Sequence, residues 1–129
     1  MGEYSARNLD RRALIEHWNG TAWQVVSIPD ACASSMSYPR TTLLSVTAAG
    51  ARDVRAVGSF GGCSRTNGYD QVLIEQWDGT AWHRIASPAL NGALVSSLDA
   101  VTTDGAGNFW AVGSCTKFGA DQTLIEHSP

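Results

Sequence analysis

The hydrophobic residues of this chain fall in short runs rich in branched and aromatic side chains, and Gly, Asn, Asp and Ser residues separate the runs. No long stretch shows the 3.6-residue period of an amphipathic helix. In Thr42–Ala48, the residues Leu44, Val46 and Ala48 fall on one face of an expected strand. Such runs, bounded by turn residues, are typical of β-strands, so the pattern predicts an all-β protein.

A ten-residue phrase organises the chain. LIEHWNGTAW at Leu14–Trp23 returns as LIEQWDGTAW at Leu73–Trp82, with eight of ten positions identical, and LIEH occurs again at Leu124–His127. The central Asn-Gly and Asp-Gly pairs favour a two-residue type I′ turn. Each full copy is therefore predicted to form a β-hairpin.

A second motif repeats between the copies of the first. SVTAAGARDVRAVGS at Ser45–Ser59 aligns with AVTTDGAGNFWAVGS at Ala100–Ser114. Together the two motifs define a unit of four strands and roughly 50–60 residues, the size of a kelch-type propeller blade. We label the strands of a blade a to d from the propeller axis outward.

The repeats predict a single β-propeller fragment over residues 1–129, with four-stranded antiparallel blades and about two blades per chain. Residues 13–28 are expected to form strands c and d of a partial blade, 42–86 a complete blade, and 98–127 strands a, b and c of another partial blade. Residues 1–12 are expected to lie in a loop.

Two blades alone would leave large apolar sheet faces exposed, and such faces signal association. Propellers typically close with about 4–8 blades. We therefore expect identical chains to close the ring together as a homo-oligomer of two to four chains. A trimer with six blades is preferred, on size alone.

The motifs NFWAVGS at Asn108–Ser114 and QTLIEH at Gln122–His127, with the ten-residue phrase, resemble the kelch-like, galactose-oxidase-type β-propeller repeats of bacterial, often secreted, proteins. The resemblance covers nearly all of the chain beyond residue 12. It departs at Arg55, because the equivalent position is Trp110. It implies a toroid with a binding face and is compatible with an extracellular location, and it brings no catalytic residues.

The expected strand order gathers the long b–c and d–a connections on one face of the blades. Variable loops on a rigid scaffold are where binding usually resides. Solvated loop side chains are the alternative interpretation. The candidate binding residues on this face are Tyr38, Arg40, Arg65, Asn67, Tyr69, Asn91 and Lys117.

Three cysteines fall on the same expected face. Cys32 precedes strand a and Cys63 follows strand b of one blade, so a disulfide between them is geometrically possible. Three free thiols are the alternative, which a cytosolic setting would favour. Cys115 is not expected to be a nucleophile, because no unique His or acid is evidently placed beside it.

Composition narrows the function classes. The net charge is −3 and Lys and Arg form no cluster, which argues against a nucleic-acid partner. No apolar run approaches the length of a membrane span. Neither a metal site nor another cofactor is expected, because two of the three histidines belong to the repeated strand. The recurring Glu16, Glu75 and Glu126 are interpreted as structural residues that satisfy neighbouring groups.

The sequence therefore predicts a non-enzymatic binding module that self-assembles and holds a protein or glycan ligand. One alternative is a glycan-binding or glycan-processing propeller domain. An enzyme of this kind would need unique acids or a metal set near the axis, where the innermost strands offer only Asp99. Another alternative is a propeller fragment whose only activity is self-assembly.

Overall fold

The computed structural model describes residues 1–5, 11–32, 39–63, 66–67, 69–88 and 93–128. These residues form ten β-strands, which confirms the all-β prediction, and none of them belongs to a helix that could cross a membrane. The strands are β1 (Gly2–Ser5), β2 (Arg11–Trp18), β3 (Trp23–Val26), β4 (Arg40–Gly50), β5 (Asp53–Gly61), β6 (Gln71–Trp77), β7 (Trp82–Ile85), β8 (Ala93–Thr103), β9 (Phe109–Lys117) and β10 (Ala120–Ser128).

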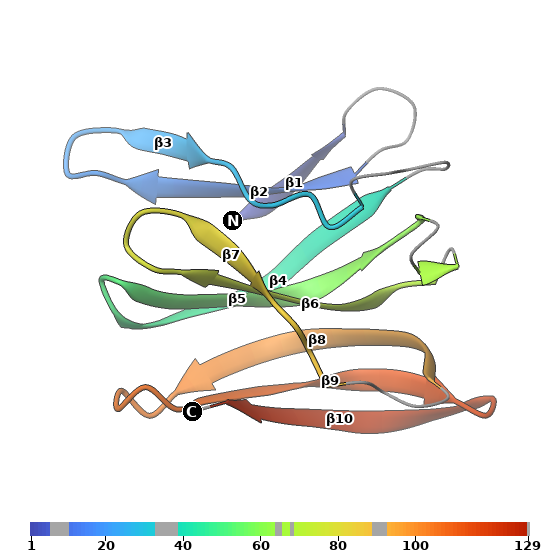
Figure 1. Cartoon of the computed structure of the whole chain (residues 1–129). Helices are drawn as coiled ribbons and strands as arrows, with labels where there is room; N and C mark the ends of the chain where they lie inside the picture. The colour runs from blue at the N-terminus through green and yellow to red at the C-terminus, as the bar shows by residue number, and fades with distance from the viewer. Residues whose placement is uncertain (6–10, 33–38, 64–65, 68, 89–92, 129) are drawn as a thin grey trace.

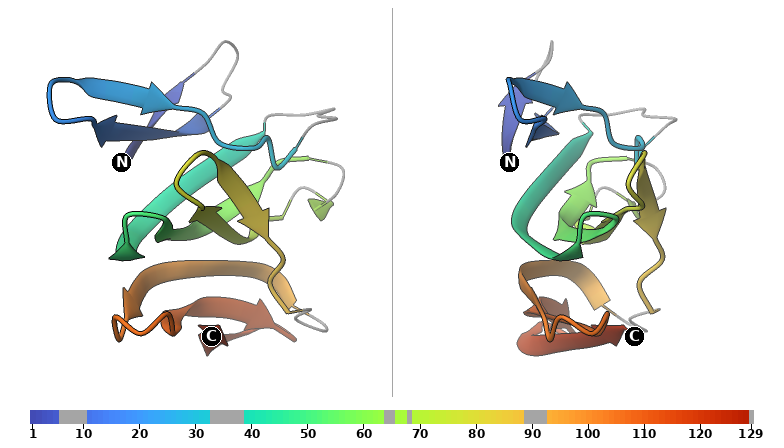
Figure 2. Two further views of the ribbon diagram at one scale, coloured as in Figure 1. Left: turned by 60° about the vertical axis from the view of Figure 1, so that its left-hand side comes forward. Right: turned by 90° about the vertical axis from the view of Figure 1, so that its left-hand side faces the viewer.

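The strands form three stacked layers, which Figure 1 and both views of Figure 2 show. We call β1–β3 the first unit, β4–β7 the second unit and β8–β10 the third unit; within each unit, neighbouring strands pair antiparallel. The first and second units share one sheet through a single parallel pair, Arg11 with Arg40. The described strands do not close into a barrel or ring.

The repeated hairpins use a longer turn than the sequence predicts. β2 ends at Trp18 and β3 begins at Trp23, so residues 19–22 form the loop, and Gly20 has positive φ (98°). The Asn19 side chain caps this loop by accepting hydrogen bonds from the backbone N–H groups of Thr21 and Ala22, both at 2.9 Å. Asp78 plays the same part in the second copy. The prediction of a two-residue turn was wrong, because the Asn19 or Asp78 side chain closes each loop and no second residue with positive φ is needed.

A two-residue turn occurs instead between β9 and β10. Phe118 and Gly119 both have positive φ, 52° and 76°, as a type I′ turn requires. The sequence predicts a loop over Cys115–Asp121, but the two strands continue through this segment and pair down to Lys117 and Ala120. Phe118 is an unusual residue for this conformation, so turn composition did not reveal the turn.

The first unit contains a strand where a loop was predicted over residues 1–12. β1 pairs with β2, and Gly2 stands opposite Leu14. The matching positions of the other two units are Gly58 opposite Leu73 and Gly113 opposite Leu124. MGEYS at Met1–Ser5 therefore occupies the position of VGSFG at Val57–Gly61. β1 corresponds to the second half of strand b.

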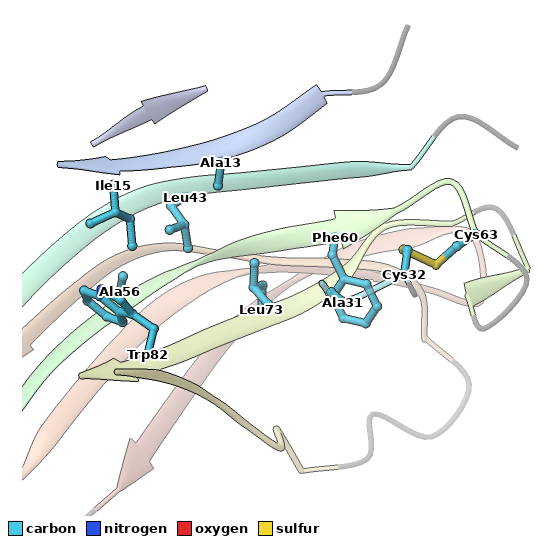
Figure 3. Packing of buried hydrophobic residues seen from close by; sticks show 10 residues of the cluster. All are labelled: Ala13, Ile15, Ala31, Cys32, Leu43, Ala56, Phe60, Cys63, Leu73 and Trp82. Carbon is cyan, nitrogen blue, oxygen red and sulfur yellow. A yellow bond between two sulfur atoms is a disulfide. The ribbon is translucent and has the colours of Figure 1, made fainter. Parts of the chain in front are cut away.

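Two apolar clusters hold the layers together. The first, shown in Figure 3, lies between the first and second units and includes Ile15, Leu73 and Trp82. The second lies between the second and third units and includes Val57 and Leu98. We call these contacts the first joint and the second joint. The second unit thus uses opposite faces of its strands for its two neighbours.

Candidate functional site

The two joints are built from the same repeat positions. Ile15 of β2 and Ile74 of β6 are equivalent; Ile15 faces the second unit and Ile74 faces the third. Ala56 of β5 and Ala111 of β9 are also equivalent, and each faces the unit that precedes its own. One face therefore always packs on the preceding unit, and the opposite face on the following unit.

The same hydrogen bond also appears at both joints. At the first joint, the N–H of Ala13 donates to the Thr41 hydroxyl oxygen at 3.0 Å. At the second joint, the N–H of Val72 donates to the Ser96 hydroxyl oxygen at 3.2 Å. Ala13 and Val72 are equivalent in the repeat. The joints thus share polar as well as apolar contacts.

The first unit has a free face on the side away from the second unit. Trp18 and Trp23 lie on it with ring centroids 5.8 Å apart and are 48% and 66% exposed. Their equivalents on the second unit are Trp77 and Trp82, which pack in the same way at 5.9 Å but belong to the first joint. Trp82 is only 8% exposed. The free face is therefore an uncovered copy of a face that the molecule covers elsewhere.

The third unit has the complementary free face. Val112 and Ile125 point away from the second unit and are 43% and 62% exposed. Their equivalents on the second unit, Val57 and Ile74, pack against the third unit in the second joint. The free faces of the first and third units lie at opposite ends of the stack (Figure 1). The free face of the first unit corresponds to the face that packs on a preceding unit. The free face of the third unit corresponds to the face that packs on a following unit.

The neighbourhood of β1 is also open. A Cβ atom added to Gly58 or Gly113 would collide with a backbone carbonyl oxygen of the adjacent strand, Thr42 or Ser97. A Cβ added to the equivalent Gly2 would meet nothing within 4 Å. No described strand pairs with the outer edge of β1. The place that β4 and β8 occupy in their units is therefore empty in the first unit.

A cavity of about 370 Å³ opens beside this empty place, in the first joint. Its walls are mostly apolar, with Val46 and Val54 on one side and His17 among the lining residues. At the second joint, the position equivalent to Val54 is Phe109, whose ring is covered by the Arg55 guanidinium at 4.4 Å. In the first joint, nothing described stands in the place of Arg55.

Glu75 is fully buried between β5 and β7, opposite Arg84 on the β7 side. Neither of its carboxylate oxygens has a hydrogen-bond partner in the structure. Burial raises the pKa of Glu75 to about 7, although the positive charge of Arg84 acts in the opposite direction. The expectation that this recurring Glu satisfies its neighbours was therefore wrong at Glu75. Its equivalent Glu16 is exposed.

The loop candidates are only partly brought together. Arg40 pairs with Asp70 at 2.9 Å, and Asn67 and Tyr69 are exposed close by in the sequence. Lys117 lies in β9 instead of a loop, with its ammonium group 5.5 Å from the Phe118 ring centroid. The remaining candidates, Tyr38, Arg65 and Asn91, fall outside the described residues.

The structure contains a disulfide between Cys32 and Cys63, with their Cα atoms 5.7 Å apart. It links the segment after β3 to the segment after β5, so it ties the first unit to the second. Cys115 is buried with a free thiol. Among the described residues, no three His, Cys, Asp or Glu side chains are grouped as a metal site.

Sequence reasoning expected exposed faces, but it did not say which residues form them. The signal lay in the alignment of the units, because each exposed residue has a buried copy. Comparisons with family models, with curated proteins and with solved structures found no match for this chain.

Proposed function

We propose that this chain is a non-enzymatic β-propeller-type interaction module that associates with copies of itself. The observation that carries the proposal is the relation between the free faces and the joints. The free face of the first unit copies a face that packs inside the molecule, and the free face of the third unit copies its internal counterpart. Another copy of the chain can therefore cover both free faces with contacts of the kind that the two joints already use.

The area left uncovered is apolar enough to drive this association. Trp23, Val25 and Ile125 are 66%, 68% and 62% exposed. Full burial of a branched apolar side chain contributes roughly 1.5–3 kcal/mol. Burial of several such residues on each face opposes the loss of freedom of one partner, which costs about 4–15 kcal/mol.

Repetition of one joint supports a ring as the form of the assembly. The two faces of this contact differ, and a contact of this kind closes into a ring when its rotation permits. The stacking of antiparallel units with one shared register agrees with the propeller-blade interpretation of the repeats. We propose two to four chains per ring, with three preferred.

The test is the absolute mass of the chain in solution at micromolar concentration, by light scattering and native mass spectrometry. One discrete oligomer is expected. Val112→Lys, which places a charge on the free face of the third unit, is expected to shift it towards the monomer. Phe118→Lys is the control, because Phe118 is 85% exposed but lies in a turn. A folded monomer at all concentrations contradicts the proposal.

A further inference from the structure

We propose that the association is a strand exchange, in which β2 of one copy takes the place of β10 beside β9 of a second copy. This inference rests on the proposed self-association and identifies its contact residue by residue. In the exchanged contact, Leu14 of one copy stands opposite Gly113 of the other. Neighbouring pairs follow in antiparallel order.

β9 cannot distinguish the two strands by their central residues. Leu14–His17 and Leu124–His127 have the identical sequence LIEH. In the structure, Leu124 stands opposite Gly113 and His127 opposite Trp110. Leu14 already stands opposite the equivalent glycine, Gly2. The exchanged strand therefore enters in a register that the fold uses for both strands already.

β2 also brings a further strand with it. β3 pairs with β2 from Trp18–Trp23 to Ile15–Val26. The outer edge of β10 has no pairing partner among the described strands. After exchange, β8, β9, β2 and β3 lie in the order of β4, β5, β6 and β7. The exchange thus turns two three-stranded units into one four-stranded unit.

The cavity in the first joint also favours the exchange. With β9 of the second copy beside β2, Trp110 comes opposite His17, a lining residue, on the side that faces Val46 and Val54. Trp110 holds the repeat position of Arg55, whose guanidinium covers the ring equivalent to Val54 at the second joint. Trp110 is 48% exposed in the single chain. The exchange therefore buries this indole in the cavity of about 370 Å³.

The open side of Gly2 completes the argument. In the exchanged unit Gly113 replaces Gly2, and β8, which lies against Gly113 in its own chain, fills the space beside it. The exchange releases β10 and β1. The ladder of β10 with β9 is replaced pair for pair around LIEH, whereas β1 gives up only the pairs from Gly2–Leu14 to Ser5–Arg11.

The test uses cysteine pairs in a Cys115→Ser background. One copy carries Ala13→Cys and the other Ser114→Cys, because Ser114 stands opposite Thr123, the equivalent of Ala13. The copies are unfolded with the native disulfide intact, mixed, refolded together and oxidised. We expect a disulfide-linked dimer with one copy of each variant on non-reducing gels. Glu3→Cys mixed with Ser114→Cys is the control, because Glu3 belongs to the displaced β1.

A second pair keeps the test decisive. A single chain with Ser114→Cys and Thr123→Cys forms an internal disulfide if β10 remains beside β9. The exchange is overturned if the chain is oligomeric, this internal bond forms fully and the Ala13→Cys and Ser114→Cys copies do not cross-link. That result leaves self-association standing. A monomeric mass overturns both. The interchain link in an oligomer, with little internal bond, supports the exchange.

Discussion

Glu75 and Arg84 stand directly opposite each other on β6 and β7, yet the Glu75 carboxylate accepts no hydrogen bond from the Arg84 guanidinium. The guanidinium lies 3.9 Å from the centroid of the Phe60 ring and donates a hydrogen bond to the Ala31 carbonyl oxygen at 3.4 Å. The Glu75 carboxylate is left buried without a hydrogen-bond donor. A buried carboxylate in this position favours its neutral form.

The stability of the fold should therefore depend on pH through Glu75. Its pKa of about 7 in the folded chain exceeds the ordinary value of 4.5, so the folded state binds the proton more tightly. The resulting stabilisation is complete below pH 4.5 and is lost as the pH rises through 7. We expect Glu75→Gln to raise the unfolding free energy at pH 8 by roughly 1–3 kcal/mol and to change it little at pH 4.5.

Urea unfolding at the two pH values checks this prediction. Glu3→Gln is the control, because Glu3 is exposed and lies in β1. Equal effects of Glu75→Gln at both pH values would show that the titration of Glu75 is not coupled to folding.

The disulfide between Cys32 and Cys63 should stabilise the first joint. It closes a loop with a sequence separation of 31 residues, which restricts the unfolded chain. We expect the paired change Cys32→Ser and Cys63→Ser to lower the unfolding free energy by about 2–4 kcal/mol. Thermal unfolding with and without reductant measures it, and Cys115→Ser should leave the response to reductant intact.

The glycine of strand b should tolerate no side chain where β4 or β8 packs against it. Gly113→Ala places a Cβ against the Ser97 carbonyl oxygen. We expect it to lower the unfolding free energy by roughly 1–3 kcal/mol, because the packed backbone must shift. Gly2→Ala is the control at the equivalent open position. Equal losses for the two variants in chemical unfolding would contradict the assigned packing.

The β9–β10 turn should be improvable. Phe118 has a φ of 52° and is 85% exposed, so its ring gains little in return for the left-handed backbone. Asn adopts this conformation more readily and is preferred before Gly in a type I′ turn. We expect Phe118→Asn to raise the unfolding free energy by up to about 1 kcal/mol. The thermal midpoint should rise with it. A lower midpoint would mean that the ring contributes packing.

The strand pattern and the hairpins could be predicted from sequence because both occur twice with strong turn residues between them. β1 could not be recognised by composition, since Gly2 and Glu3 are weak strand formers. Only the alignment of Met1–Ser5 with Val57–Gly61 identifies this strand. The expected role of Glu75 failed for another reason. Hydrogen-bond satisfaction depends on how the facing Arg84 side chain is placed, and its contacts with Phe60 and Ala31 arise only in the folded chain.

The candidate site was predictable only in outline. Apolar strands without full cover indicate association, but they do not say which face is free. That assignment came from pairs such as Trp23 and Trp82, which follow the same Gly-Thr-Ala sequence but are 66% and 8% exposed. Exposure differs because it is set by the adjacent unit and not by the residue itself.

The shared glycine and leucine register has a consequence for how such chains change in length. In all three units the glycine of strand b stands opposite the leucine of LIE. Recombination between the glycine codons of two different units would join the start of one unit to the end of another. Every side chain after the junction would keep its original face of the strand. Units can thus be added or removed by unequal crossing-over without the evolution of a new strand pairing. Each recombined chain keeps the contacts that join one unit to the next.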